Sequence, residues 1–127
     1  MRAAPARKKL TGFAHFLAAA SFSMGGLARL WQEAAFRQEI AAGLGLSGIY
    51  LWLAVDAETA LAAAVLFLLL IAVEALNTAI EVIVDRISPE ISETGRHAKD
   101  LGPLAVLCLV LANGLLLLYV LTLVFLS

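Results

Sequence analysis

Residues 101–127 contain no Asp, Glu, Lys or Arg. A membrane-crossing helix needs about 20 consecutive, mainly apolar residues. This run therefore predicts a span over about 101–126, with Pro103 in the first turn, where a helix tolerates proline. The composition agrees, because 62% of the 127 residues are hydrophobic and only 15% are charged. A soluble domain of this length could not bury so much apolar surface, so we expect a single-domain membrane protein over 1–127.

Two further stretches have the composition of membrane spans. Residues 40–55 carry no charge. They give only ~24 Å of helix against a ~30 Å hydrocarbon core, so the span is predicted to begin earlier, over about 34–55. Tyr50 and Trp52 then lie near its far end, where aromatic side chains anchor at the interface. A short acidic turn leads into the next predicted span, 58–84.

The segment before these spans has a different pattern. From Leu10 to Trp31 apolar residues recur at helical spacing, with polar residues such as His15 on the other side. This favours a helix that lies in the membrane surface over about 8–31, although an ordinary amphipathic core helix has the same periodicity. The predicted fold class is an all-α membrane protein with an N-terminal amphipathic surface helix and three transmembrane helices.

The positive charges give an orientation. All nine Lys and Arg lie at or before position 37 or within the polar stretch 85–100. The positive-inside rule places the N-terminus and this stretch, predicted as a loop with Pro89 and Gly95 as helix breakers, in the cytoplasm, and the C-terminus in the periplasm. There is no basic patch of the size that binds nucleic acid. A single cysteine, Cys108, excludes an internal disulfide and a cysteine-based metal cluster.

Glu74 is the residue that a simple span does not explain. Counted from Thr59, Glu74 lies ~22 Å along the second span and Glu81 ~33 Å along it, at the cytoplasmic surface. An acid within the hydrocarbon costs roughly 3 kcal/mol on insertion scales, so it needs a partner or a purpose. It belongs to a polar stripe on one helix face, made of Glu74, Asn77, Thr78, Glu81 and Asp85.

Two interpretations of this stripe remain open. It could serve helix packing, with Asn77 and Thr78 bonding across helices, but that explains two glutamates poorly. It could instead be a site at the cytoplasmic interface in which Glu74 is a general base, because a carboxylate in apolar surroundings binds a proton more readily than one in water.

More charged residues fall on the same side of the membrane. Glu33, Arg37 and Glu39 lead into the first span, and the spacing of Glu33 and Arg37 is also that of a surface ion pair. Lys99–Asp100 is predicted to open the third span, where a lysine opposes the helix dipole and suits an anionic ligand. The acids suit a divalent metal. Metal, anion and buried base together indicate phosphoryl transfer to a membrane substrate, without a P-loop or a kinase glycine-rich loop.

Three segments resemble the bacterial integral-membrane diacylglycerol kinases. They are EAAFRQE at 33–39, VEALNTAIE at 73–81 with VDR at 84–86, and AKD at 98–100. The similarity is collinear from Thr11 to the C-terminus. It implies a homotrimer in the bacterial inner membrane that transfers the γ-phosphate of ATP to diacylglycerol with Mg²⁺, giving phosphatidic acid in phospholipid recycling.

The resemblance also implies roles for individual residues. Glu74 would take the proton of the lipid hydroxyl, and Glu33 and Glu81 would hold the metal on the phosphates. The residues implied to contact ATP are His15, Phe22, Glu33, Glu81, Glu90, Lys99 and Asp100. Those implied to contact the lipid are Ala35, Phe36, Arg37, Gln38, Glu39, Glu74 and Asn77.

This chain departs from the family pattern at several positions. They are His15 in place of Arg, Phe22 in place of Tyr, Ile91-Ser92 in place of Tyr-His, Pro103 in place of Ser, and one residue fewer before Glu33. An undecaprenol kinase of the same family is an alternative, since acceptor choice depends on pocket shape. A small proton-coupled transporter is another, but it would leave Lys99–Asp100 without a task. A structural subunit would leave every acid unexplained.

Overall fold

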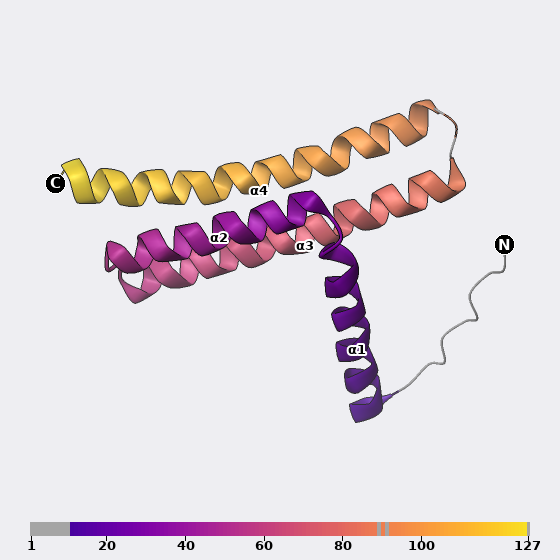
Figure 1. Cartoon of the computed structure of the whole chain (residues 1–127), viewed down its shortest axis with the longest axis horizontal. Helices are drawn as coiled ribbons and strands as arrows, with labels where there is room; N and C mark the ends of the chain where they lie inside the picture. Colours follow the sequence, from indigo (N-terminus) through magenta and orange to yellow (C-terminus); the bar gives the residue numbers. More distant parts are fainter. Residues whose placement is uncertain (1–10, 89, 91, 127) are drawn as a thin grey trace.

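The computed structural model describes residues 11–88, 90 and 92–126. Within these ranges the chain is all-helical, as predicted, and forms four helices without strands. They are α1 (Gly12–Leu30), α2 (Ala34–Trp52), α3 (Ala57–Ile87) and α4 (Glu93–Leu126). Helices α2, α3 and α4 run alongside one another, and α1 projects sideways from them (Figure 1).

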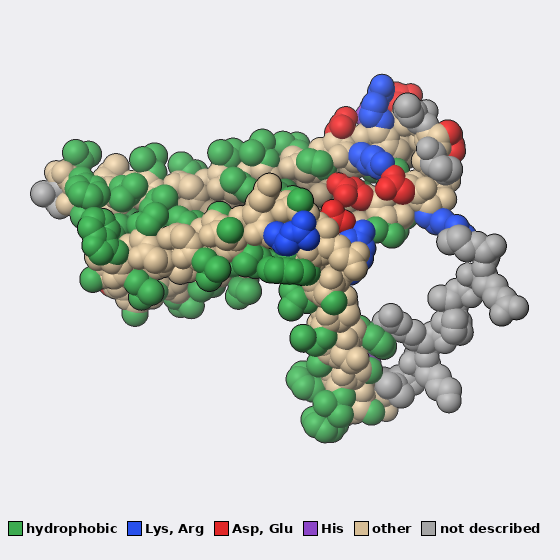
Figure 2. All heavy atoms as spheres, viewed as in Figure 1, with side chains coloured by type: hydrophobic (Ala, Val, Ile, Leu, Met, Phe, Trp, Pro, Cys, Tyr) green, Lys and Arg blue, Asp and Glu red, His purple; other side chains and the backbone are tan. Residues whose placement is uncertain are grey.

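Helices α3 and α4 are long and apolar enough to cross a membrane. They contain 31 and 34 residues, with mean hydropathies of 2.5 and 2.6 in their most apolar windows. These windows are mostly exposed, unlike the core helix of a soluble protein, and Figure 2 shows hydrophobic side chains over the outside of the bundle. Helix α2, with 19 residues, extends ~28 Å, close to the thickness of the hydrocarbon core.

The helices contact one another through a small number of close approaches. Helix α4 passes directly over Asn77 of α3 at Gly102, where an added Cβ would overlap the Asn77 side chain. Farther along the same pair, the Asn113 amide donates to the carbonyl oxygen of Leu66 at 3.2 Å. Helix α2 packs against α3 through fewer residues. The buried apolar side chains are Leu30, Phe36, Tyr50, Leu70 and Val120.

Helix α1 has most of its large apolar side chains exposed, although Leu30 at its end is buried. Phe13, Phe16, Met24 and Trp31 are each more than half exposed. The helix crosses the direction of the other three, so a bundle that stands in a bilayer would lay α1 along the surface (Figure 1). The predicted helix is present between Gly12 and Leu30, and its earlier predicted residues, 8–10, lie outside the described part of the chain.

The turn between α2 and α3 ends one helix and caps the next. Ala54 adopts a positive φ of 53°, which reverses the chain after α2. The Asp56 carboxylate then accepts a hydrogen bond from the Thr59 amide at 2.8 Å and caps α3. The hydrogen bonds from Thr59 hold the pKa of Asp56 below its usual value.

The prediction of a loop over 85–100 is wrong. Helix α3 continues to Ile87 and α4 begins at Glu93, so most of this stretch is helical. Gly95 does not break the helix: it is buried in the first turn of α4, where an added Cβ would lie 3.3 Å from a Val84 methyl carbon of α3. The residues are polar because both helices extend beyond the apolar windows, and a helix in water has polar faces. Pro89, the other predicted breaker, lies outside the described residues.

The early start of α4 also moves two other predicted features. Pro103 lies well inside the helix rather than in its first turn. Without an amide hydrogen it cannot donate to the carbonyl oxygen of Lys99, four residues earlier. Lys99 and Asp100 lie in the second turn, so they do not open the helix and lie beyond the first turn, where the helix dipole acts most strongly on a charge.

Candidate active site

Glu74 is buried in the middle of the bundle although it is an acid. Its side chain is 4% exposed, and Asn77 and Thr78 on the same face of α3 are almost as buried. This part of the predicted polar stripe therefore faces protein, whereas Glu81 is half-buried and Asp85 is exposed. The side chain of Glu39 on α2 lies against that of Glu74, so two carboxyl groups from different helices meet at this point.

Two buried polar atoms near Glu74 have incomplete hydrogen bonding. The side-chain amide of Asn77 donates a long hydrogen bond of 3.4 Å to Oε1 of Glu81, one turn farther along α3. The Oδ1 atom of Asn77 is buried and has no hydrogen-bond partner among the described residues. Oε2 of Glu39 is also buried, and its carboxyl group can bond to that of Glu74 only when one of the two carries a proton. A buried polar atom in this condition costs roughly 1–3 kcal/mol, which favours a ligand that supplies the missing bonds.

The joint between α1 and α2 positions Glu33. Its carboxylate pairs with Arg29 of α1 at 2.8 Å rather than with Arg37, the partner that helical spacing suggested. Arg37 instead donates to the carbonyl oxygen of Trp31 at 2.9 Å. Phe36 anchors the joint: it is 1% exposed, and its ring meets the Trp31 ring edge-on at 6.1 Å.

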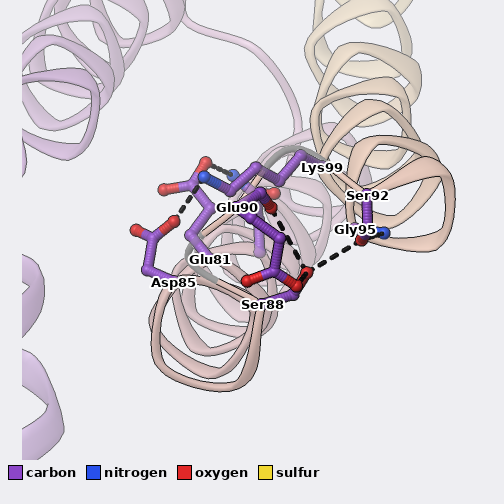
Figure 3. A network of polar contacts seen from close by, with 8 residues as sticks. Glu81, Asp85, Ser88, Glu90, Ser92, Gly95 and Lys99 are labelled. Carbon is purple, nitrogen blue, oxygen red and sulfur yellow. Dashed lines mark hydrogen bonds and ion pairs between the residues drawn. The ribbon is translucent and has the colours of Figure 1, made fainter.

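A second polar group lies where α3 and α4 meet (Figure 3). Lys99 reaches from α4 to Asp85 on α3 and forms an ion pair with it, one turn beyond Glu81. The Ser88 hydroxyl donates to a Glu90 carboxylate oxygen at 3.1 Å, and the hydroxyls of Ser88 and Ser92 share a bond at 2.8 Å.

This network also fixes the start of α4. The Ser92 hydroxyl accepts a hydrogen bond from the Gly95 amide at 3.0 Å. A side chain that accepts from the amide three residues later is a typical N-terminal helix cap. Ser92 thus takes a structural part here, whereas Ile91, the other half of the departure at 91–92, lies outside the described residues. Figure 2 shows the acidic and basic side chains gathered at this end and at the α1–α2 joint.

The chain brings together some predicted site residues and leaves others apart. Glu39, Glu74, Asn77 and Glu81 form one group. His15 and Phe22 lie exposed on α1, which points away from the α3–α4 turn that carries Glu90 (Figure 1). Asp100 is exposed beside Lys99. Ala35 and Gln38 line a cavity that Glu39 also borders.

A metal would have to be held by few protein ligands. In the described ranges, 11–88, 90 and 92–126, no three His, Cys, Asp or Glu side chains form a group that could hold an ion. Mg²⁺ in nucleotide sites commonly binds one or two carboxylates, with phosphate oxygens and water completing its shell. Glu33 and Glu81 carry carboxylate oxygens, the type of donor that Mg²⁺ prefers, but Glu33 is paired with Arg29 and Glu81 accepts from Asn77.

Sequence reasoning missed three contacts of this site. Arg29 forms an ion pair with Glu33, Lys99 forms one with Asp85, and Glu39 lies against Glu74. The spacing of four between Arg29 and Glu33 could have suggested the first. The other two join different helices, and no periodicity within one helix signals them.

Comparison with known proteins assigns the chain to a family. The profile of the prokaryotic diacylglycerol kinase family matches residues 21–121. The chain is 52% identical over 113 residues to a diacylglycerol kinase of Sinorhizobium sp, covering 89% of this chain and 82% of that one. It is 47% identical over 98 residues to a diacylglycerol kinase of Escherichia coli strain K12, covering 76% and 80%.

The chain belongs to the prokaryotic diacylglycerol kinase family. A diacylglycerol kinase of Pseudomonas aeruginosa is 43% identical to it over 100 residues. The family match includes every candidate site residue except His15, which precedes residue 21. The resemblance on which the sequence analysis relied is therefore confirmed at the level of the family.

Proposed function

We propose that this chain is a membrane diacylglycerol kinase that transfers the γ-phosphate of ATP to the hydroxyl of diacylglycerol. The observation that carries the proposal is the buried Glu74, which meets Glu39 within the bundle while the charged residues lie toward one end. The relatives named diacylglycerol kinase support the choice of acceptor and donor.

The membrane arrangement is part of this proposal. Helix α2 joins α3 and α4 as a third span, since its ~28 Å length suits the hydrocarbon core despite the charges in its first turns. The end that carries Lys99 faces the cytoplasm of the bacterial inner membrane, where the basic residues belong, and the C-terminus faces the periplasm. The working unit is a homotrimer, which would cover part of the exposed apolar surface of the single chain.

The proposed chemistry begins with a proton. The Glu74 carboxylate takes the proton of the lipid hydroxyl while the hydroxyl oxygen attacks the γ-phosphorus of ATP. The bond from the γ-phosphorus to the bridging oxygen of ADP breaks, which leaves phosphatidic acid and ADP. Asn77 orients the acceptor through its buried Oδ1 atom, and the segment Ala35, Phe36, Arg37, Gln38 and Glu39 borders the path by which the lipid arrives.

The nucleotide side of the site is formed by charged groups. Glu33 and Glu81 would hold Mg²⁺, which neutralises phosphate charge when bound. Lys99 exchanges its pairing with Asp85 for the phosphates, because a doubly or triply charged anion attracts an ammonium more strongly than one carboxylate does. Asp100, Glu90, His15 and Phe22 complete the proposed nucleotide contacts, the last two by movement of α1 or from a neighbouring subunit.

One assay tests the proposal. The purified protein in lipid is given labelled ATP with diacylglycerol or with undecaprenol, and phosphorylated lipid is measured. We expect label in phosphatidic acid, with far less in undecaprenyl phosphate. Label mainly in undecaprenyl phosphate would assign the chain to the other acceptor, and label in neither lipid would exclude a lipid kinase.

A further inference from the structure

An apolar groove, open along one side, leads away from Glu39 between α2, α3 and α4. Its inner chamber, about 340 Å³, is bordered by Glu39 at one end and by Leu70 and Leu117 farther along. Its outer chamber, about 590 Å³, continues past Tyr50 to Val55. Both chambers touch Gly43, Leu46, Phe67 and Asn113, so the two spaces adjoin at this level.

The junction between the chambers is set by a glycine and an aromatic ring. A Cβ placed on Gly43 of α2 would lie 2.5 Å from the Phe67 ring of α3, closer than real side chains approach. Glycine therefore allows the ring to lie directly over α2. On the other wall, the side-chain amide of Asn113 donates both of its hydrogens. One goes to the carbonyl oxygen of Leu66 on α3 at 3.2 Å and the other to that of Leu109 in its own helix at 2.7 Å.

The position of the groove indicates what would occupy it. A space that is mainly apolar within a bilayer holds hydrocarbon rather than water. Its inner end is at Glu39, whose side chain lies against Glu74. The diacylglycerol that gives phosphatidic acid has its free hydroxyl on one terminal carbon of glycerol and ester-linked chains on the other two carbons. With that hydroxyl at Glu74, one chain starts at the mouth of this groove. From Glu39 to Leu51 the groove follows ~18 Å of α2, enough for most of a long chain.

We infer that the groove holds one acyl chain of the lipid acceptor and that Gly43 and Phe67 form a gate between its chambers. This inference rests on the proposed function and deepens it. A short chain ends in the inner chamber and never meets the gate. A long chain must pass Phe67 into the outer chamber, so the gate determines which chain lengths the site accepts.

The test compares a long-chain with a short-chain acceptor. Dioleoylglycerol and dihexanoylglycerol are offered to the full chain in lipid, and kcat/KM is measured for each. Gly43→Ala pushes the Phe67 ring toward the groove and narrows the gate, so we expect the long-to-short ratio of kcat/KM to fall at least fivefold. Gly48→Ala is the matched control on α2, because a Cβ there meets nothing within 4 Å.

A second variant distinguishes a gate from general damage. Phe67→Ala removes the ring that the new methyl would strike, so the double variant Gly43→Ala/Phe67→Ala should recover the wild-type ratio to within twofold. If Gly43→Ala lowers kcat/KM equally for both acceptors, or if the double variant does not recover the ratio, the proposed gate does not exist. An equal loss together with dissociated subunits would instead assign the groove to a second copy of the chain. Wild-type protein inactive on both glycerides would overturn the proposed function itself.

Discussion

The two ends of the α3–α4 pair bury polar side chains in different ways. At the outer end, where α3 begins and α4 ends, Asn113 is buried, and both hydrogens of its side-chain amide are bonded to backbone carbonyls. Toward the end where the charges gather, Asn77 is equally buried, but its Oδ1 atom lacks a hydrogen-bond partner among the described residues.

This difference separates structure from function. A polar group whose bonds are complete within the chain stabilises the packing of two helices and needs nothing more. A polar group buried with its bonds incomplete lowers stability, and such groups persist where a ligand completes them. Asn113 therefore holds α3 and α4 together, whereas the site around Asn77 is prepared for a ligand. The predictions below test this division from the largest expected effect to the smallest.

After Glu74, whose variant is the final test, the largest effect is expected at Lys99. Lys99→Met keeps most of the side-chain length but deletes the charge that would neutralise the transferring phosphoryl group, so we expect a rate loss of about a hundredfold or more. Arg96→Met, which removes an exposed charge from the same helix, is the control and should stay within twofold. Phosphorylation of diacylglycerol is measured, with helicity and oligomeric state unchanged. A rate for Lys99→Met near that of the control would remove Lys99 from the site.

A smaller effect, with a different signature, is expected at the metal carboxylates. Glu33→Gln and Glu81→Gln each remove one oxygen ligand for Mg²⁺, so activity should fall roughly tenfold and recover in part at raised Mg²⁺. The dependence of rate on Mg²⁺ concentration gives the comparison. Glu74→Gln should show no recovery. Identical Mg²⁺ responses in all three variants would contradict the separate roles of metal ligand and base.

At the outer end the expected change is in stability. Asn113→Leu keeps a similar size but loses the bond to Leu66, and such bonds within membranes contribute about 0.6 kcal/mol on average and up to ~1.7 kcal/mol. We expect the free energy of unfolding to fall by about 1 kcal/mol, measured by denaturation in detergent. Glu74→Gln, which replaces an acid by a neutral amide at a buried position, should not lower it. A larger loss of unfolding free energy in Glu74→Gln than in Asn113→Leu would contradict the different roles of these two positions.

The smallest effect concerns the cap at the start of α3. Because the pKa of Asp56 is held below its usual value, its cap stabilises the fold above the unfolded pKa of about 3.9 and loses that contribution as the pH falls below it. Unfolding midpoints at pH 7 and pH 3 measure this change. Asp56→Asn keeps a cap that cannot titrate, so it should reduce the pH dependence. An unchanged pH dependence in Asp56→Asn would assign it to other groups.

Helical periodicity was sufficient to predict the buried face of α3. Glu74, Asn77 and Thr78 lie where the stripe placed them, because spacing along one helix fixes which side chains share a face. The predicted loop over 85–100 failed because polarity was taken to indicate a loop. In the structure it marks two helices that continue past the apolar windows, with Ser92 as a cap and Gly95 as a packing residue.

Contacts between helices could not be predicted in this way. The pairing of Lys99 with Asp85 and the approach of Phe67 to Gly43 depend on how two helices are rotated and offset. A single sequence leaves that geometry open, since several packings bury the same apolar stripe. The groove beside α2 became visible only with the fold.

The most direct test of the account measures ATP consumption with and without diacylglycerol in wild type, in Glu74→Gln and in Glu58→Gln, an acid at the other end of α3. Wild type and Glu58→Gln should consume ATP at similar rates and only when diacylglycerol is present. Glu74→Gln should fold normally and lose nearly all of this activity, because the proton acceptor is gone while the shape is kept. Turnover by Glu74→Gln within a few-fold of wild type, or ATP consumption that does not depend on lipid, would contradict the account.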